Sequence, residues 1–465
     1  MNNSQRFTRA LLALALAVSS VTAYAQGGQN PAAPKGAKPA AKPALSKTIN
    51  VNYKDVKLKN GLRVLLVEDH SAPVISLAVT YDTGSRNERK GRTGFAHLFE
   101  HMMFQGSENV GKGEHFVVVF NNGGTMNGTT NTDRTNYYET LPSNQLDLAL
   151  FLEADRMRSL DISKENLDNQ RNAVQEERRL GVDNQPYGKA VEQFGEAMYD
   201  NFAYKHSTIG SMEDLNAASV DDVKEFFRVY YAPNNAVLAL VGDFKTEEAL
   251  AKIKKHFEAI PAQPAPPPVD MTEPEQTAER RLTVEDPLAQ LPLVFIGYKG
   301  IVGNTADYYA IQVLNEALAE GRSSRLYQRL IKEKQLAAQV FGGIDERRGP
   351  GYYQLGALAA PGKKTEEVEA VIYEEIAKLQ QEPIADWELE KAKNSARRGS
   401  IQALQSSENT AVRLSQYAVY YNDPNLINTQ FQKIAAVTKE DVQRVAKKYL
   451  KASNRTIALA VPKSR

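Results

Sequence analysis

The chain contains no cysteine among its 465 residues. Disulfide bonds, thiolate zinc sites and cysteine nucleophiles are therefore excluded. The net charge is only +1, so the composition indicates neither nucleic acid nor an anionic membrane surface as a partner. With 24% charged and 42% hydrophobic residues, the chain has the composition of a globular protein, and its length predicts two or more domains.

After the first 25 residues, no segment is apolar over a stretch long enough to span a membrane, so we expect no span in the mature chain. A short apolar segment, 10–18, follows two arginines and precedes Ala23-Tyr24-Ala25, an A-x-A cleavage pattern. This predicts a signal peptide over 1–25 and a periplasmic or secreted mature protein; an uncleaved anchor is the alternative. Residues 26–47, rich in Ala, Pro, Gly and Lys, are predicted to form a flexible tether.

Histidine is scarce, with six in the chain, yet His97 and His101 stand four residues apart with Glu100 between them. In a helix these three side chains share an arc of about 100°. Two such histidines can bind one Zn²⁺, and a carboxylate beside them can take a proton from water. The order His-x-x-Glu-His is the inverzincin motif. The alternative is a polar outer helix face. The opposite face would bury Phe95, Leu98, Phe99, Met102 and Met103.

The helix that carries these histidines is expected to begin at Thr93, a favourable N-cap residue. A third metal ligand is expected on another helix, 164–180. In that helix Glu177 shares one face with three apolar residues, Ala173, Val174 and Leu180. A carboxylate that points inward needs a cation, which would be Zn²⁺ or, alternatively, a buried Arg or Lys. Gln170 lies two turns earlier on this face and is a candidate second-layer partner.

Strand patterns precede and follow the helix that carries His97 and His101. Segments 51–59 and 62–67 enclose Asn60-Gly61, the strongest short hairpin signal, and 74–81 alternates like a third strand. Gly123-Gly124 opens a polar extended stretch, 125–140, rich in Asn and Thr. Such a strand is either a solvated sheet edge or an edge that binds an extended peptide.

A proline-dense segment, 263–274, separates two halves of similar plan. The expected elements of the second half are strand 291–298, helix 308–319, strand 351–359, helices 365–380 and 387–416, and strand 456–461, which mirrors 236–241. Aligning Phe104-Gln105-Gly106 with Ala319-Glu320-Gly321 places Gln312, Asn315 and Glu316 at the positions of the two histidines and Glu100. The second half therefore cannot reproduce the metal site.

Four motifs in this order resemble the pitrilysin-type inverzincin metallopeptidases, the insulinase-like family. The nearest resemblance is to its short bacterial branch, which is similar to the zinc-bearing subunit of mitochondrial processing peptidase. The motifs are the histidine helix 93–107, the glycine-led strand 123–130, the third-ligand helix and its sequel 169–188, and the second-half element 321–326.

The resemblance implies an α+β fold of two homologous domains, each an antiparallel-rich sheet packed with helices, which together form half of a clam-shell chamber. We place the zinc-bearing domain at 48–258, a linker at 259–281 and the inactive domain at 282–465. The family implies one Zn²⁺ per chain. We infer Zn²⁺ rather than Mn²⁺ or Co²⁺ from the type of ligand and from the availability of the metals. It also implies roles for His97, His101 and Glu177 as ligands and for Glu100 as general base.

By the same resemblance, short or unfolded peptides would bind as an added strand along Gly124, Thr125, Asn127 and Thr129. The chain departs from the family in one motif. Catalytically complete members of the family carry an Arg and a Tyr in a motif like Leu-Arg-x-x-x-Gln-Leu-x-Tyr, and these two residues orient the substrate and stabilise the oxyanion. Here Leu330–Ala338 carries Ile331 and Ala338 at those positions. We therefore expect a heterodimer with a homologous subunit that supplies the Arg/Tyr pair.

Two alternatives stay open at this point. One is a self-sufficient homodimer that uses Tyr352, Tyr353 or Arg325 instead of the missing pair. The other is a non-catalytic core subunit of the same fold, against which the intact residues of the His-x-x-Glu-His motif and Glu177 argue.

Overall fold

The first sheet is built from six strands of the N-terminal half. The computed structural model describes residues 50–463, so the predicted signal peptide and tether lie outside the described residues. The strands are β1 (Lys54–Lys57), β2 (Arg63–Glu68), β3 (Val74–Tyr81), β4 (Thr125–Thr130), β5 (Thr135–Pro142) and β6 (Ala236–Gly242). Their order is β1-β2-β6-β3-β5-β4, and β2 runs parallel to β6 while the other pairs are antiparallel.

Two turns explain the local course of this sheet. The predicted hairpin is confirmed: β1 pairs with β2 around Gly61, whose φ is 90°, a conformation that glycine adopts without strain. The stretch expected to be one extended segment instead folds into β4 and β5. Asn131 turns the chain there because its side-chain oxygen accepts hydrogen bonds from the backbone N–H groups of Asp133 and Arg134. The predicted sheet edge is confirmed, since β4 is the outermost strand.

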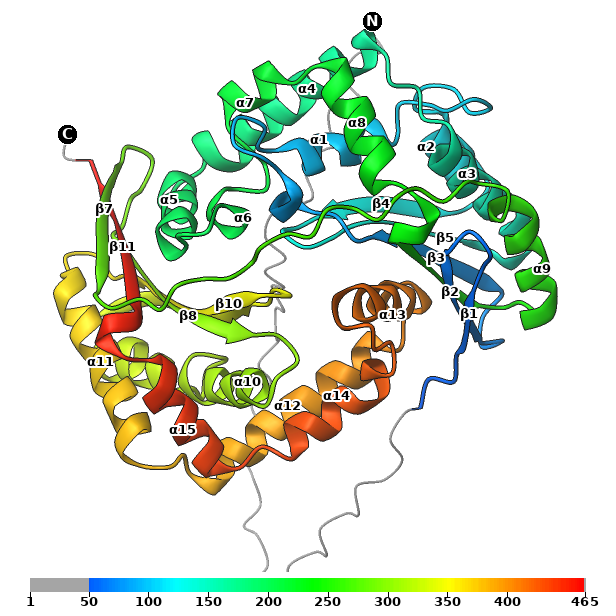
Figure 1. Cartoon of the computed structure of the whole chain (residues 1–465). Coiled ribbons are helices and arrows are strands. Elements are labelled where there is room, and N and C mark those ends of the chain that lie inside the picture. The colour runs from blue at the N-terminus through cyan, green and yellow to red at the C-terminus, as the bar shows by residue number, and fades with distance from the viewer. Residues whose placement is uncertain (1–49, 464–465) are drawn as a thin grey trace, which may run out of the picture. The chain divides into compact units, whose positions relative to one another are not determined.

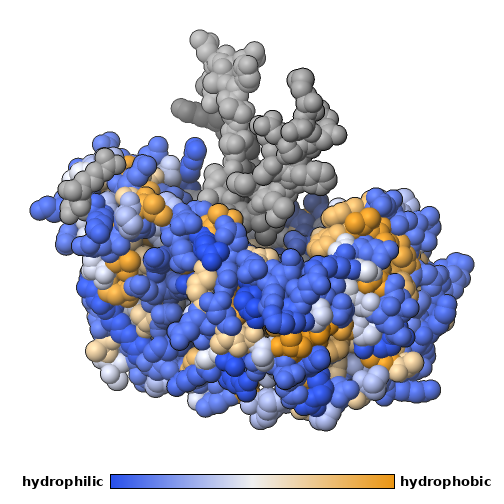
Figure 2. All heavy atoms as spheres, turned by 90° about the horizontal axis from the view of Figure 1, so that it is seen from above, coloured by the Kyte–Doolittle hydropathy of each residue, from blue (hydrophilic) through white to orange (hydrophobic). Residues whose placement is uncertain are grey.

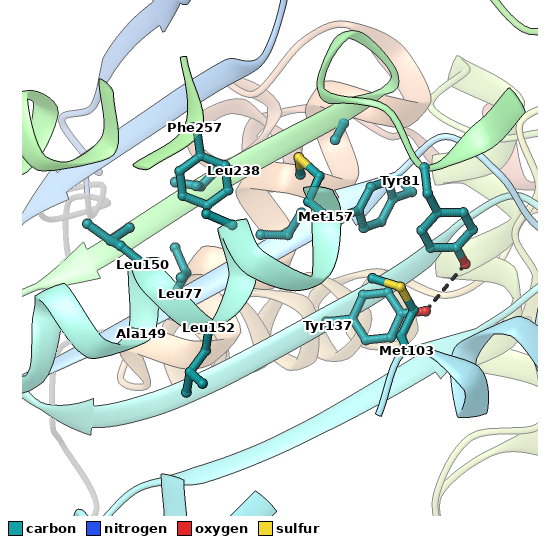
Figure 3. Close-up of a cluster of buried hydrophobic side chains, with 14 of the residues drawn as sticks. Leu77, Tyr81, Met103, Tyr137, Ala149, Leu150, Leu152, Met157, Leu238 and Phe257 are labelled. Atoms are coloured by element: carbon teal, nitrogen blue, oxygen red, sulfur yellow. Dashed lines mark hydrogen bonds between the residues drawn. The ribbon is translucent and has the colours of Figure 1, made fainter. Parts of the chain in front are cut away.

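The helices of the N-terminal half pack mainly on one face of this sheet and enclose the first core. They are α1 (Phe95–Met102), α2 (Glu114–Asn121), α3 (Leu146–Arg158), α4 (Lys164–Arg178), α5 (Gly188–Met198), α6 (Phe202–Lys205), α7 (Met212–Ala217), α8 (Val220–Tyr230) and α9 (Thr246–Phe257). One of them, α5, packs on the second sheet instead. A π-helical turn, Arg179–Asp183, follows α4. The core joins strand residues such as Leu77 and Tyr137 to Leu150 of α3 and Phe257 of α9 (Figure 3).

The second sheet repeats this plan with five strands. They are β7 (Arg280–Asp286), β8 (Leu293–Val302), β9 (Ala337–Asp345), β10 (Pro350–Ala359) and β11 (Arg455–Pro462), in the order β7-β11-β8-β10-β9. Its helices are α10 (Ala306–Leu318), α11 (Thr365–Gln381), α12 (Asp386–Ala403), α13 (Ser407–Tyr421), α14 (Leu426–Ala435) and α15 (Lys439–Tyr449). The fold is thus α+β with two sheets of similar construction, as expected.

Several local predictions for the second half need correction. The helix expected over 387–416 is two helices, because Ser406 caps α13 by accepting a hydrogen bond from the backbone N–H of Asn409. Strand β7 begins at Arg280, inside the segment expected to be a linker. That segment is also held in place: the carboxylate of Glu273 pairs with Lys299 at 2.6 Å, and both side chains are buried.

The two halves exchange helices. Helix α13 lies against β3 and β6 of the first sheet (Figure 1), where Leu414 and its neighbours pack on Leu65 and Ala78. Conversely, α5 packs on β7, β8 and β11 of the second sheet. There Phe194 fills the space above Gly297, where an added Cβ would lie 2.5 Å from the phenylalanine ring. Each sheet is therefore covered on one face by a helix from the other half.

The surface carries few large apolar side chains. Figure 2 shows a mostly hydrophilic face with scattered apolar residues. The large apolar side chains exposed among the described residues are Val117, Phe120, Leu180, Val191, Leu288, Val302, Trp387 and Ile401. No helix within residues 50–463 has the length and apolar character needed to cross a membrane.

Because α13 covers the first sheet, its core residues should stabilise both halves. Leu414 is fully buried, and we expect Leu414→Ala to lower the free energy of unfolding by about 2–5 kcal/mol through lost burial and a cavity. Ile401→Ala, at an exposed site on α12, is the control and should change it by about 0.5 kcal/mol or less. Urea unfolding followed by circular dichroism measures both. Equal effects of the two changes would contradict the packing role of α13.

Candidate metal centre

Helix α1 has two chemically different faces, as its sequence predicts. Its apolar side chains are buried in the first core: Phe95, Leu98, Phe99, Met102 and Met103. His97, Glu100 and His101 lie on the other side, with ligand atoms all within 4.8 Å of one another. Burial of the apolar face thus fixes which way the three polar side chains point.

The start of α1 differs from the prediction. Gly94, with φ 83°, is the N-cap residue, and Thr93 makes no capping bond; its hydroxyl donates to Asp214 at 2.5 Å instead. The helix N-terminus is satisfied from a distance by Glu88, whose carboxylate accepts from the backbone N–H groups of Gly94 (2.9 Å) and Ala96 (2.8 Å). A long-range carboxylate has replaced the local cap, and no local pattern signals it.

Glu177 of α4 meets both histidines. Its Oε2 lies 3.3 Å from His101 Nε2 and 3.7 Å from His97 Nε2. A tetrahedral zinc ion with bonds of about 2.0–2.2 Å separates its ligand atoms by about 3.3–3.6 Å. The two distances from Glu177 to the imidazole nitrogens are close to this range, and two imidazoles with one carboxylate match the open set of three protein ligands found in catalytic zinc sites. The donor chemistry and its spacing therefore suit Zn²⁺.

The argument that led to Glu177 was partly wrong. We expected its side of α4 to face an apolar interior, but the Glu177 side chain is 51% exposed. Of its three apolar neighbours on that side only Val174 is buried, whereas Ala173 and Leu180 are exposed. The shared face meets the polar face of α1 rather than the core. Helix periodicity identified the correct side of α4 without revealing what lies opposite it.

Two of the three predicted ligands, His97 and Glu177, have pKa shifts that favour metal binding. Burial, reinforced by His101, lowers the pKa of His97 to about 4, which keeps this imidazole neutral and able to bind a cation. The hydrogen bond with His101 lowers the pKa of Glu177 despite partial burial. Burial alone would lower the pKa of His101, but its hydrogen bonds with Glu177 and Gln170 and the nearby Glu100 raise it overall. Gln170, itself nearly buried, thus contacts a predicted ligand.

Glu100 is held under the edge strand. Its Oε2 accepts a hydrogen bond from the Thr130 hydroxyl at 2.5 Å. Gly128 crosses directly above it, so that an added Cβ would lie 3.1 Å from Glu100 Cγ. Burial raises the pKa of Glu100, and the Thr130 hydrogen bond opposes this rise only in part. A buried carboxylate with a raised pKa is a stronger base at neutral pH than an exposed one.

Strand alternation decides which residues of β4 face Glu100. Gly128 and Thr130 do, so the side chains of Asn127 and Thr129 lie on the opposite face of the sheet. The hydroxyl of Thr129 bonds Asn136 there. Thr125 is exposed. The other predicted position, Gly124, packs tightly, with Leu141 Cγ 2.7 Å from an added Cβ. Sequence reasoning therefore missed Gly128 and Thr130. The period of two along a strand would have placed these two residues on one face.

A second acidic cluster lies in the first core. His115, Glu139 and Glu153 also bring ligand atoms within 4.8 Å of one another. All three are buried, and Glu153 is paired with the fully buried Arg156. Burial raises the pKa of Glu139 to about 8. The guanidinium already supplies a cation to this cluster, so it is a buried ionic network rather than a competing metal site.

The second half has a cavity lined by the residues that align with the histidine motif, but these residues are not histidines. Gln312, Asn315 and Glu316 of α10, the residues aligned with the histidine motif, line a cavity of about 450 Å³ together with Ser395 of α12. Ser395 donates to Glu316 at 2.9 Å, and Asn315 accepts from Tyr353 at 3.1 Å. Within the described part of this half, no group of three His, Cys, Asp or Glu residues has metal-ligand spacing.

Comparison with known proteins agrees with this division. The family model described as insulinase (peptidase family M16) matches residues 63–211, and the model of the peptidase M16 inactive domain matches 217–396. The zinc protease PqqE of Helicobacter pylori is 32% identical over 413 residues, which cover 88% of this chain and 93% of that protein. This chain belongs to peptidase family M16. The expected family resemblance is confirmed.

Solved structures show the same fold. A protease from Helicobacter pylori has a TM-score of 0.85 and covers 88% of this chain and 99% of that one. The periplasmic protease PqqL from Escherichia coli, at 18% identity, gives a TM-score of 0.73 and matches 89% of this chain but only 48% of its own.

A further relative by sequence, a probable mitochondrial-processing peptidase subunit beta of Arabidopsis thaliana, is 23% identical, covering 84% of this chain and 75% of that one. The M16 relatives named zinc proteases make this a metallopeptidase-type chain.

The ligand geometry predicts a difference between two neighbouring glutamates. We expect Glu177→Gln to lose the zinc that the unmodified chain retains through dialysis, because an amide supplies no anionic oxygen to the site. Glu176→Gln is the matched control: Glu176 is exposed and pairs with Arg179, so its change should leave zinc content unaltered. Elemental analysis measures both variants. Equal zinc content in the two would contradict the assignment of Glu177.

Proposed function

We propose that this chain is a zinc-dependent endopeptidase in which His97, His101 and Glu177 hold the metal and Glu100 is the general base. The observation that carries the proposal is the approach of both histidine Nε2 atoms to one Glu177 oxygen. Four side chains from two helices thus converge in a geometry that suits hydrolysis. One Zn²⁺ per chain is proposed because, among residues 50–463, the only other group with ligand spacing, His115, Glu139 and Glu153, is already paired with Arg156.

The chain's own residues divide the chemistry between them. When bound, a zinc ion supplies Lewis acidity that polarises a carbonyl oxygen and makes water a better nucleophile near neutral pH. Glu100 takes the proton of the attacking water and passes it to the leaving amine. The Thr130 hydroxyl donates to Oε2 of Glu100 and so holds this carboxylate in position. Gln170, which raises the pKa of His101, is proposed to steady this imidazole from α4.

Substrate is proposed to bind as an added strand on β4. The backbone N–H of Asn131 donates to Arg134 within the hairpin, so alternate residues of β4 pair inward and those between them, Gly128 and Thr130 included, leave their backbone groups at the open edge. An extended peptide would pair there directly above Glu100. Gly124, Thr125, Asn127 and Thr129 would support it mainly through the strand they belong to. This mode selects short or unfolded peptides, because only they present a free extended segment.

The two positions at which the family motif carries an Arg and a Tyr hold Ile331 and Ala338, neither of which can donate a side-chain hydrogen bond to an oxyanion. Ile331 is partly buried in the second core, and Ala338 is exposed on β9. The alternative donors are occupied: Tyr353 is fully buried, and Arg325 forms two hydrogen bonds with Glu388.

We therefore propose a heterodimer in which a homologous subunit supplies the Arg/Tyr pair. PqqL, of which this fold makes up about half, and a relative named as a subunit support paired units. Tyr352, the remaining candidate for a homodimer, is buried in an aromatic cluster with Tyr199 and Phe194. Because PqqL is called a periplasmic protease, we propose that this chain, with its predicted signal peptide, also acts in the periplasm or outside the cell.

The exchange Glu100→Gln separates a peptidase from a non-catalytic core subunit. We expect kcat on a peptide library to fall about 10²–10⁴-fold because the amide cannot accept a proton, while zinc content stays the same. Glu108→Gln, an exposed residue near the same helix, should alter neither quantity. A chain whose activity survives Glu100→Gln would contradict the base assignment, and an unmodified chain inactive with every partner would support the core-subunit alternative.

The heterodimer proposal predicts that activity depends on a partner. The chain alone should hold zinc but turn over peptides slowly, because no group stabilises the oxyanion. Addition of a homologous subunit from the same compartment that carries the Leu-Arg-x-x-x-Gln-Leu-x-Tyr motif should raise kcat about 10²-fold or more. A digest with and without that subunit, combined with light scattering, measures this. Full activity of the isolated chain as a monomer or homodimer would reject the proposal.

A further inference from the structure

The two helices that carry the ligands are far apart in the sequence, and one short segment contacts both. His101 and Glu177 are separated by 177 − 101 = 76 residues. The segment His206–Ser211, between α6 and α7, reaches the start of α1 on one side and the end of α4 on the other. Its contacts decide how the two helices are held relative to each other.

On the α1 side, the segment is joined to Glu88. This carboxylate is fully buried and accepts three hydrogen bonds: from the backbone of Gly94, from the backbone of Ala96 and from His206 Nε2 at 2.9 Å. Ala96 immediately precedes the ligand His97. The backbones of the segment and the helix also touch, because a Cβ on Gly94 would lie 2.6 Å from the carbonyl oxygen of Ile209.

The surroundings of His206 require it to be a cation. Its Nδ1 lies 2.8 Å from the carbonyl oxygen of Phe202, and its Nε2 lies 3.0 Å from that of Ser85 and 2.9 Å from Glu88. Carbonyl oxygens only accept hydrogen bonds, so both ring nitrogens must donate, and only the imidazolium has two N–H groups. The ring stacks on Phe202 at 4.5 Å.

Other charges near the ring agree with this state. Burial alone would lower the pKa of His206, but its hydrogen bond with Glu88 and the two carbonyls raise it overall. Glu196 adds a further negative charge nearby. The neighbouring cations are Lys205, which precedes it in the chain, and Lys90, whose Nζ lies 6.0 Å above the Phe202 ring. Burial raises the pKa of Glu88, and the hydrogen bond with His206 opposes this rise, so an imidazolium at His206 is the partner that favours the charged carboxylate.

On the α4 side, the segment is bound by the residue that follows Glu177. Arg178 donates to the carbonyl oxygen of Gly210 at 2.8 Å and pairs with Glu192 through two hydrogen bonds. Gly210 has φ 75° and so little space that an added Cβ would lie 2.4 Å from the carbonyl oxygen of Thr93. Ser211 closes the contact, its backbone N–H donating to the Thr93 hydroxyl at 3.1 Å.

We propose that the segment His206–Ser211 sets the spacing between the two ligand-bearing helices and that His206, as an imidazolium paired with Glu88, is its positioning residue. The inference rests on the proposed zinc function for its consequence, although the contacts stand without it. Loss of the cation would leave a buried, unpaired carboxylate that protonates or turns away. The first turn of α1 would then lose both capping bonds, and His97 would shift relative to Glu177.

The test uses the full chain with His206→Gln, Glu88→Gln and His206→Lys. We expect the two glutamine variants to bind zinc about tenfold or more weakly in chelator competition, as for changes beside ligands in other sites, and His206→Lys to recover part of the loss. His70→Gln is the matched control, since His70 forms an exposed pair with Glu68 and Asp243 far from α1 in sequence; it should keep full affinity. Unchanged zinc affinity in folded His206→Gln would overturn the proposal.

Two measurements do not depend on zinc or on activity. The ¹⁵N shifts of His206 at neutral pH should show two protonated nitrogens, and amide exchange at Gly94 and Ala96 should accelerate in the metal-free His206→Gln chain. A neutral His206 or unchanged exchange overturns the proposal even where zinc binds. The unmodified chain could bind no zinc while His206 is doubly protonated and amide exchange accelerates in His206→Gln. In that case the proposed function fails, but the role of the segment in setting the spacing between α1 and α4 stands. Should His206→Gln not fold, Arg178→Gln, compared with Arg178→Lys, tests the other arm by the same exchange and affinity measurements.

Discussion

The approach of one Glu177 oxygen to two imidazole nitrogens is the contact on which the arrangement of the site depends. It joins a helix of eight residues to another that comes much later in the chain. Metal ligands tolerate displacements of only about 0.2 Å, so the supporting contacts must be as specific as the ligands. The buried Glu88, the loop after α6 and Arg178 supply that support from outside both helices. A site of four side chains thus draws on contacts spread over more than a hundred residues.

The exchange of helices extends this constraint to the second half. Helix α5 follows α4 after a single π-helical turn and packs on the second sheet, while α13 returns from the second half to cover the first. The helix that carries the proposed third ligand is therefore followed closely by an element anchored in the second half. The β9–β10 turn adds to this, because the backbone of Arg348 donates to Asp133 in the turn of the β4–β5 hairpin. The second half in this way helps to hold the edge strand that crosses Glu100.

The two halves show how one architecture is kept while its chemistry is lost. Gln312, Asn315 and Glu316, which align in sequence with the histidine motif, line a cavity in the second half. Hydrogen bonds from Ser395 and Tyr353 now satisfy the polar groups there, so the second half needs no cation. Fold and catalysis are separable because the core residues of α10 hold the helix in place whatever its outer face carries.

The sequence by itself determined the features whose cause is local. The faces of α1, the Asn60-Gly61 hairpin, the strand at Val74–Tyr81 and the family followed from spacing and motifs, because helix and strand periods are set by a few neighbouring residues. Tertiary structure alone decided that Glu88 rather than Thr93 caps α1, that Glu177 faces the polar side of α1, and that α13 covers the other half's sheet. These depend on residues far apart in the chain that meet only after folding, and no local period records such meetings.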